Sequence, residues 1–268
     1  MIPRGAGLLG LLACAAAVWA QAPTPERTSA AIEMSRKVAL AYARSLPDFI
    51  CTQLVHRYIE PNIDLALYSQ RVSWRPLDTL TIRLSYFDQR EDHTLVLVNG
   101  KPSEKSYTDL GGAISAGEFA LMQKQVFDRA SQADFTWKKW NKAGKRQAAT
   151  YLYRVDVSHS RFMLDFLTPA GLTQDIVGHH GTLELDRETG NVLSMTYIAD
   201  AIPKTCPISL SNTAVSYEFA DVGGKQYLLP ASSETEMRSR ELWTRNHAVY
   251  RDYRKFSTDS TVRFGDGR

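Results

Sequence analysis

The six histidines are the first candidates for a metal site or a catalytic base, because imidazole binds metals and transfers protons near neutral pH. His179 and His180 are adjacent, and adjacent side chains of a β-strand point to opposite faces, so the pair does not favour one shared ion. The other four are isolated and lack the HxH or HExxH spacing of metal sites. They are His56, His93, His159 and His247. The sequence therefore predicts no metal site and no cofactor.

Motifs for nucleophilic catalysis and nucleotide binding are also missing from the sequence. There is no GxSxG, SxxK or papain-like cysteine motif. Gly111-Gly112 and Gly223-Gly224 lack the spacing of phosphate-binding loops and read as turn glycines. Asp and Glu occur throughout, and nothing in the sequence singles out a catalytic pair. We therefore expect a protein that is not an enzyme, with an extracytoplasmic hydrolase kept as a third hypothesis.

Aromatic side chains are the remaining signal, at 10% of the chain. Many fall on predicted strands, several at alternating positions that would share one face. We predict that they line a hollow that takes an acyl chain or a similar apolar ligand. The alternative is that they fill the space between helix and sheet. The candidate lining residues are Trp74, Tyr86, Phe135, Trp137, Tyr151, Tyr153 and Phe166.

Composition and charge narrow the class of protein. The chain has 268 residues, 44% of them hydrophobic, and 32 Lys plus Arg against 29 Asp plus Glu. This balance is too even and too scattered to indicate nucleic-acid binding. Basic residues gather over residues 138–146 and 238–255, where they suit anionic lipid headgroups or a partner's acidic face, or form solvated turns. No linker or repeat divides the sequence, so residues 21–268 are predicted to form one domain.

Residues 1–20 have the pattern of a secretory signal peptide. Arg4 precedes an apolar run that is too short to span a bilayer, and Ala20 offers a small residue at the cleavage site. The mature chain would begin near Gln21, would contain no transmembrane segment, and would be periplasmic or secreted. The alternative is a lipoprotein, because Leu11-Leu-Ala-Cys14 resembles a lipobox and would anchor the chain to a membrane through Cys14.

Two further cysteines, Cys51 and Cys206, would remain in an oxidising compartment after cleavage. We expect them to form a disulfide bond, which would close a very long loop. The alternative is two buried free thiols.

Hydrophobic periodicity predicts one long helix, one short helix and many strands. Thr24 and Pro25 begin an amphipathic helix that Pro47 ends, and Ser115-Ala-Gly-Glu118 matches a capping box ahead of a short helix. Alternating or β-rich runs predict the strands. They cover residues 49–58, 64–74, 79–87, 93–98, 135–140, 149–157, 160–167, 182–186, 191–198, 215–219, 225–229, 242–250 and 253–264.

This element order favours an α+β fold, because the helices are set apart from a run of antiparallel strands. A sheet this wide accumulates twist and curls. We therefore expect a large curved antiparallel sheet, a half-open β-barrel, with the N-terminal helix and the short inserted helix on its concave face.

The sequence resembles the periplasmic lipoprotein-carrier (LolA-like) fold. The resemblance rests on Gly181-Thr-Leu-Glu-Leu-Asp186, Gly190-Asn-Val192, Tyr217 and Tyr227-Leu-Leu-Pro230, in the order of strands found in that family. It implies non-enzymatic handling of a lipid, a lipoprotein or another apolar ligand. Leu46–Gln53 and Asp252–Phe256 are similar to stretches of uncharacterised secreted bacterial proteins, acidobacterial ones especially.

Two main hypotheses for function remain. The first is a cell-envelope protein that binds an apolar ligand in the hollow of the sheet. The second is an envelope protein–protein interaction module whose core is closed by its own helices.

Overall fold

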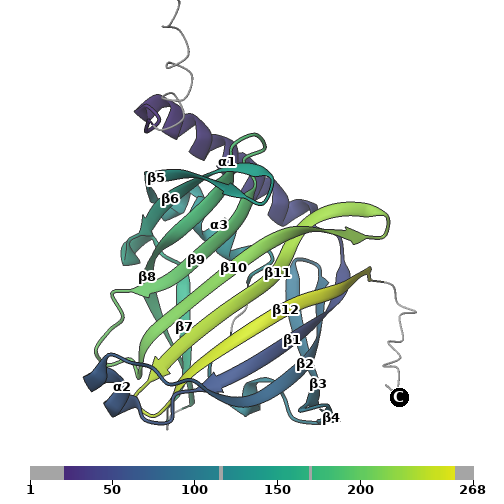
Figure 1. Cartoon of the computed structure of the whole chain (residues 1–268), viewed down its shortest axis with the longest axis vertical. Helices are drawn as coiled ribbons and strands as arrows, with labels where there is room; N and C mark the ends of the chain where they lie inside the picture. The colour runs from purple at the N-terminus through teal and green to yellow at the C-terminus, as the bar shows by residue number, and fades with distance from the viewer. Residues whose placement is uncertain (1–20, 115–116, 169–170, 257–268) are drawn as a thin grey trace, which may run out of the picture.

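One antiparallel sheet of twelve strands organises the structure, a computed structural model that describes residues 21–114, 117–168 and 171–256 (Figure 1). Neighbouring strands follow the order β4-β3-β2-β1-β12-β11-β10-β9-β8-β6-β5, and β7 pairs with β8 off this path. The strands of the first half are β1 (Phe49–Ile59), β2 (Arg75–Phe87), β3 (Arg90–Val98), β4 (Lys101–Pro102), β5 (Asp134–Ala143) and β6 (Arg146–Val155). Those of the second half are β7 (Phe162–Thr168), β8 (Gly171–Asp186), β9 (Val192–Asp200), β10 (Ile208–Val222), β11 (Lys225–Ser239) and β12 (Trp243–Lys255).

The sheet curves strongly but does not close, because β4 and β5 are its two ends and do not pair with each other in the described chain. Within the described residues, three α-helices accompany it: α1 (Pro25–Ser45), α2 (Ile63–Ser69) and α3 (Leu121–Phe127). α1 lies across one end of the sheet and contacts α3, whereas α2 projects at the opposite end (Figure 1). The predicted α+β fold, a half-open barrel with helices on its concave face, is confirmed.

Local chemistry explains where α1 begins and ends. The Thr24 side chain accepts a hydrogen bond from the Arg27 amide at 3.4 Å, and Pro25 occupies the first turn, where a missing N–H costs nothing. Pro47 follows closely after the last turn. Ile32 and Ala39 are buried against the sheet, so the helix covers it with one face.

The short inserted helix differs from its prediction at its first turn. α3 begins at Leu121, and its N-cap residue is Ala120, which has no side chain to accept a hydrogen bond. Glu118 is buried in the interior and does not cap the helix, while Ser115 lies outside the described residues. The capping-box prediction is therefore wrong, although a short helix does follow it, with Met122, Val126 and Phe127 buried.

A second difference concerns residues 64–74, which were predicted as a strand. They contain α2 instead, and the Asn62 side chain caps this helix by accepting a hydrogen bond from the Leu65 amide at 3.0 Å. The run Leu65-Ala-Leu-Tyr68 is short and apolar, a pattern that periodicity alone does not assign to helix or strand.

The two strands predicted at the C-terminal end are a single strand within the described residues. β12 runs through Arg251 and Asp252, where a turn was expected. Asp252 has a positive φ of 57°, and the pairing of β12 with β1 shifts register near it, so the chain bulges here instead of reversing. Residues 257–264 lie outside the described chain.

The buried side chains form two large clusters and one small one on the sheet. The first lies under α1 and α3 and includes Tyr151, Leu183 and Tyr197. The second lies between β1, β2 and β12 and includes Phe49, Leu80 and Leu84. The sheet therefore has its concave face largely filled by the chain's own side chains.

The two cysteines are free and buried in different clusters. Cys51 belongs to the second cluster, whereas Cys206 packs in the small third cluster beside β7 and β8. The predicted disulfide bond is therefore not present, and the alternative of two buried thiols describes the structure. An even number of cysteines carries no information about the distance between them.

Candidate ligand-binding site

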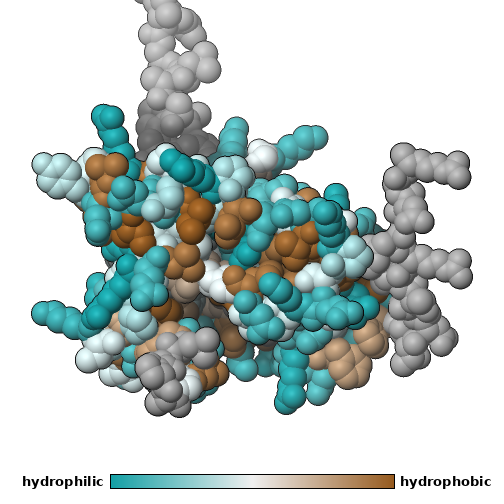
Figure 2. All heavy atoms as spheres, turned by 90° about the horizontal axis from the view of Figure 1, so that it is seen from below, coloured by the Kyte–Doolittle hydropathy of each residue, from teal (hydrophilic) through white to brown (hydrophobic). Residues whose placement is uncertain are grey.

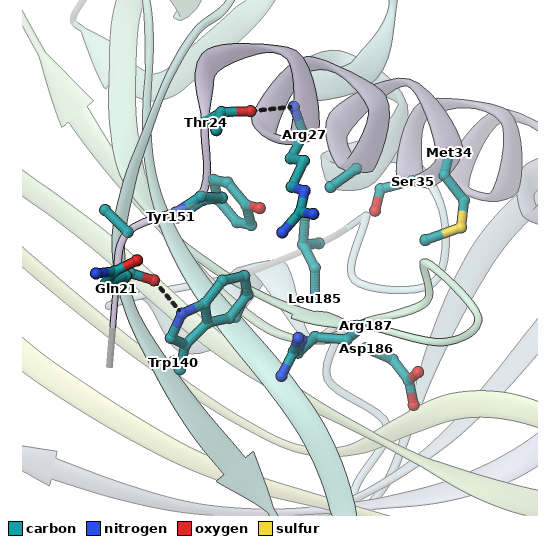
Figure 3. Close-up of a pocket in the computed structure, with 14 residues that line it drawn as sticks. Gln21, Thr24, Arg27, Met34, Ser35, Trp140, Tyr151, Leu185, Asp186 and Arg187 are labelled. Atoms are coloured by element: carbon teal, nitrogen blue, oxygen red, sulfur yellow. Dashed lines mark hydrogen bonds between the residues drawn. The ribbon is translucent and has the colours of Figure 1, made fainter. Parts of the chain in front are cut away.

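A cavity of about 430 Å³ opens between the first turns of α1, the strands β5 and β6, and the turn that joins β8 to β9 (Figure 3). This volume lies in the range of small-molecule sites. Its apolar walls come from Ala31, Met34, Trp140, Tyr151 and Leu185. Residues from the start of α1 and from the sheet thus share one site.

A β-bulge places two tryptophans on the same side of β5. Trp137 pairs with Tyr151 and Trp140 pairs with Ala149, but the register shifts between Trp137 and Lys139. Without the bulge, strict alternation would point Trp140, which is three residues after Trp137, to the opposite face. The two indole rings instead lie 5.5 Å apart, and Trp140 Nε1 donates a hydrogen bond to the Gln21 carbonyl oxygen at 2.9 Å.

The turn after β8 is organised by the buried carboxylate of Asp186. Its Oδ1 accepts hydrogen bonds from the amides of Glu188 and Thr189, both at 2.9 Å, and its Oδ2 accepts one from Arg146 at 3.0 Å. Burial works to raise the pKa of Asp186, but the hydrogen bonds from Thr189, Arg146 and Glu188 outweigh it and lower that pKa. Asp186 therefore stays ionised and fixes the turn.

The same turn carries Arg187 over the cavity and Gly190 against α1. The Arg187 guanidinium lies 4.2 Å from the centre of the Trp140 ring, in a cation–π arrangement. Gly190 has a φ of 74°, and a Cβ at this position would approach Met34 Cγ to 2.9 Å. Only glycine allows the turn to come this close to the helix backbone.

The polar groups of the cavity favour an anion. Arg27 reaches into it from α1, and Arg187 faces it from the turn (Figure 3). Asp186 is the one acidic residue among the described lining residues, and its oxygens are already occupied by amides and by Arg146. Ser35 Oγ is buried in the lining without a hydrogen-bond partner in the described chain. Apolar walls with two guanidinium groups suit an amphiphile that carries a negative group.

The structure brings part of the predicted lining set to this cavity. Tyr151 lines it, and Trp137 packs against Trp140 at its wall. Phe135 stacks on Phe127 with ring centres 5.7 Å apart, beneath α3. The Tyr153 hydroxyl donates a hydrogen bond to the Thr196 carbonyl at 2.9 Å in the first cluster.

The other predicted lining residues lie elsewhere. Tyr86 stacks on Phe49 at 5.2 Å in the second cluster. Trp74 packs edge-on against Trp243 at 5.8 Å, near α2. Phe166 packs against the small third cluster. The seven residues therefore do not form one continuous lining.

Sequence reasoning missed three residues that matter at the cavity: Arg27, Trp140 and Arg187. Arg27 and Arg187 are single basic residues in a chain that contains many. Trp140 was on the predicted strand, but the bulge that turns it inward has no sequence signature apart from the pair Lys138-Lys139.

Residues 103–114 and 117–120 cover the rest of the concave face, and side chains of the sheet bind their backbone. Arg57 donates a hydrogen bond to the Gly111 carbonyl at 2.8 Å, and Asn246 donates one to the Ala113 carbonyl at 2.5 Å. The Glu91 carboxylate accepts hydrogen bonds from the amides of Gly117 at 2.9 Å and Phe119 at 3.3 Å. Burial, and then the nearby Glu118, raise the pKa of Glu91 to about 8.

The adjacent histidines have separate surroundings. His179 is fully buried, stacks on Tyr197 at 4.3 Å, and has a pKa lowered to about 4 by burial and by His180. It is therefore a neutral packing residue. His180 lies on the other side of β8, 3.6 Å from Asp200. Within residues 21–114, 117–168 and 171–256, no group of three or more His, Cys, Asp or Glu side chains is placed to hold a metal.

The described chain contains no helix with the length and apolar character needed to cross a membrane. No protein-family model matches the sequence. No curated protein matches it either.

Several solved structures are similar over most of the chain. A domain from Vibrio parahaemolyticus named for outer membrane lipoprotein sorting is 15% identical, with a TM-score of 0.37 over 86% of this chain and 93% of that one. A DUF1329 family protein from Desulfovibrio piger is 10% identical, with a TM-score of 0.38 over 87% and 94%. A LolA superfamily protein from Nitrosomonas europaea is 8% identical, with a TM-score of 0.32 over 85% and 93%.

These likenesses concern the fold, and they assign no ligand and no role to any residue of this chain. The curved, unclosed sheet with helices over its concave face is itself the LolA-like architecture that the sequence resemblance implied.

Proposed function

We propose that this chain is a non-enzymatic binding protein of the cell envelope that holds an amphiphile with one anionic group in the cavity beside α1. The proposal rests on one observation: the same cavity has apolar walls, from Trp140 and Tyr151, and two guanidinium groups, from Arg27 and Arg187. A carrier-type role is also what the LolA-like resemblance implies. The proposal includes one domain over residues 21–268, export by residues 1–20, and either release into the periplasm or medium or anchoring through Cys14.

The apolar walls and the arginines of the cavity bind different parts of the ligand. The apolar walls bind the body of the ligand by removing its surface from water, at roughly 25 cal/mol per Å². The arginines supply charge-assisted hydrogen bonds for the anionic group, and the buried Ser35 hydroxyl offers one more donor.

The test is calorimetric titration of the protein with palmitate and with 1-hexadecanol, which share a tail and differ in the head. Palmitate should bind more tightly. Arg187→Gln and Arg27→Gln should each weaken palmitate binding by about tenfold and leave hexadecanol binding nearly unchanged, because a charged hydrogen bond contributes about 1.5–3 kcal/mol. Arg90→Gln, at the distant start of β3, is the matched control. Equal affinities for the two probes in all variants would refute the proposal.

A second candidate function rests on the filling of the concave face. The two large clusters, together with residues 103–114 and 117–120, fill much of the concave face, as expected for an interaction module with a closed core. Native mass spectrometry of the protein purified without detergent separates the two. A bound small molecule released on denaturation favours the carrier, whereas apo protein that binds neither palmitate nor hexadecanol favours the module.

A further inference from the structure

The tip of the hairpin formed by β5 and β6 concentrates positive charge. Residues 138–146 contain five basic side chains and no acidic one, and all five are exposed. Asp134, the only acidic residue of the two strands, lies opposite Arg154 at the base of the hairpin. The tip therefore has an uncompensated run of positive charge. Its basic residues are Lys138, Lys139, Lys142, Lys145 and Arg146.

Acidic residues of the neighbouring elements compensate only part of this charge. Asp186 pairs with Arg146 at 3.0 Å, and Glu184 accepts hydrogen bonds from Asn141 at 2.5 Å and from Ser194 at 3.0 Å. The first turn of α1 and the β8–β9 turn contribute two acidic and two basic residues, which are Glu26, Arg27, Arg187 and Glu188. Seven basic residues therefore stand against four acidic ones, an excess of three positive charges.

The β10–β11 turn is the next neighbour, because the Arg146 guanidinium lies 4.9 Å from the centre of the Phe219 ring. This turn adds Glu218, Asp221 and Lys225, which lowers the excess to two. The whole chain has 32 basic residues against 29 acidic ones, so most of its excess positive charge is at this hairpin. At the end of the molecule away from α1, hydrophilic and hydrophobic side chains are interspersed (Figure 2).

The four lysines of the tip are available to an external anion. Among the residues that the structure describes, none of the four forms an ion pair or a side-chain hydrogen bond. A lysine ammonium group is a point charge on a flexible stem and has no fixed fork geometry. Such groups suit an array of mobile phosphates better than they suit a single rigid carboxylate site.

The basic tip borders the ligand cavity. Lys139 directly precedes Trp140, whose ring forms a wall of the cavity and lies 4.2 Å from the Arg187 guanidinium. Trp137 packs on Trp140 with ring centres 5.5 Å apart, and both indoles are only half-buried. Indole rings favour the headgroup region of a bilayer. The hairpin and the start of α1 lie together at one end of the molecule (Figure 1).

We propose that the β5–β6 hairpin docks the protein on an anionic bilayer, with Lys138, Lys139, Lys142 and Lys145 against the lipid phosphates. Each lysine near such a surface strengthens binding by about fivefold, so the docking is peripheral and reversible. A bilayer fits better than an acidic protein face, because the adjoining cavity takes an amphiphile with an anionic group, and such amphiphiles reside in membranes. This choice of occupant rests on the proposed function, whereas the charge excess does not depend on it.

The test is co-sedimentation of the full chain, at low ionic strength, with vesicles of equal parts phosphatidylcholine and phosphatidylglycerol. Lys139→Gln/Lys142→Gln should weaken binding by about 25-fold. Lys101→Gln/Lys105→Gln is the matched control, because it removes the same charge at exposed positions on and after β4, the other end of the strand path. The control should bind nearly as the unaltered chain does. Binding should fall as salt is added and should be absent with pure phosphatidylcholine vesicles.

Two further measurements locate the contact and separate it from ligand binding. Vesicles should slow amide hydrogen exchange in residues 138–147 of the unaltered chain. Lys139→Gln/Lys142→Gln should bind palmitate in solution as before, because no lysine is among the described residues that line the cavity. Vesicle binding without any palmitate binding would support the docking and refute the ligand proposal. Circular dichroism verifies that each variant is folded.

Two outcomes overturn the docking itself. The first is equal vesicle binding by the Lys139→Gln/Lys142→Gln variant and its matched control. The second is a failure of the unaltered chain to bind anionic vesicles at low salt, which would leave an acidic protein face as the occupant of the hairpin.

Discussion

Arg57 on β1 and Asp78 on β2 form a buried, two-pronged ion pair, with Nε to Oδ1 and Nη2 to Oδ2 distances of 2.6 Å. The remaining guanidinium nitrogen, Nη1, binds the Gly111 carbonyl at 2.8 Å. One arginine therefore joins two strands of the sheet to the segment that crosses the concave face.

Removing one member of this pair should destabilise the fold strongly. Asp78→Ala leaves the Arg57 charge buried without its partner, and we expect a loss of about 3 kcal/mol in the free energy of unfolding, measured by urea denaturation. Arg154→Met, which removes the exposed ion pair with Asp200, should cost less than about 1 kcal/mol. The double variant Arg57→Met/Asp78→Leu should recover part of the loss. Equal losses in the free energy of unfolding for Asp78→Ala and Arg154→Met would contradict the stabilising role given to the buried pair.

Glu91 should make stability depend on pH. Its pKa in the folded protein is raised to about 8 by burial and by Glu118, so the folded state holds a proton that the unfolded chain has released. The stability from this group is complete below the ordinary carboxyl pKa and is lost as pH rises through about 8. Glu91→Gln should therefore gain stability relative to the unaltered protein between about pH 5 and about pH 9. Parallel stability–pH curves for the two proteins would show that Glu91 titrates normally.

Gly190 should tolerate no side chain. Alanine there meets Met34 Cγ at 2.9 Å and the backbone of Met34 and Ser35 at 3.3 Å, and it also has to adopt a positive φ. We expect Gly190→Ala to lower the free energy of unfolding by about 2–3 kcal/mol. Gly224→Ala has a similar φ of 83° and nothing within 4 Å, so it should show only the backbone cost of about 1 kcal/mol. The difference between the two variants in the free energy of unfolding measures the cost of the steric contact between residue 190 and α1.

The two tryptophans of β5 should keep their shared face when the bulge is removed. Deleting Lys138 places Trp140 two residues after Trp137, so strict alternation holds both on one side and Trp140 stays opposite Ala149. Palmitate binding should therefore be retained. Trp140→Ala, in contrast, removes an apolar wall and the contact with Arg187, and it should weaken palmitate binding by about tenfold. If Trp140→Ala leaves binding intact, Trp140 is not part of the site.

The two cysteines should behave as buried thiols. Burial raises the pKa of both Cys51 and Cys206, so neither should react quickly with a thiol reagent in the folded protein. Peptide mapping after labelling in denaturant, without reductant, should find both modified. A Cys51–Cys206 disulfide-linked peptide would contradict the structure.

Periodicity predicted well wherever one face of an element is buried. Leu80, Ile82, Leu84 and Tyr86 alternate in the sequence, and all four are buried on β2. Gly223-Gly224 predicted a tight turn, and Val222 pairs with Lys225 across it.

The remaining features depend on contacts that are distant in the sequence. The bulge beside Trp140 is a property of pairing with β6, and α2 depends on a cap from Asn62 and on the anchor at Glu60. The turn that carries Arg187 comes close to α1 because Gly190 has no side chain there. None of these relationships has a period that a sequence pattern could reveal.

β4 and β5 are the two ends of the main strand path, and each has features that discourage pairing with another chain. β4 is only two residues long and contains Pro102, which offers no amide hydrogen to an incoming chain. β5 carries the bulge and exposes Lys138, Lys139 and Lys142, whose charges repel an identical neighbour. Neither end of this strand path therefore offers an incoming chain a long, flat edge on which to add a strand.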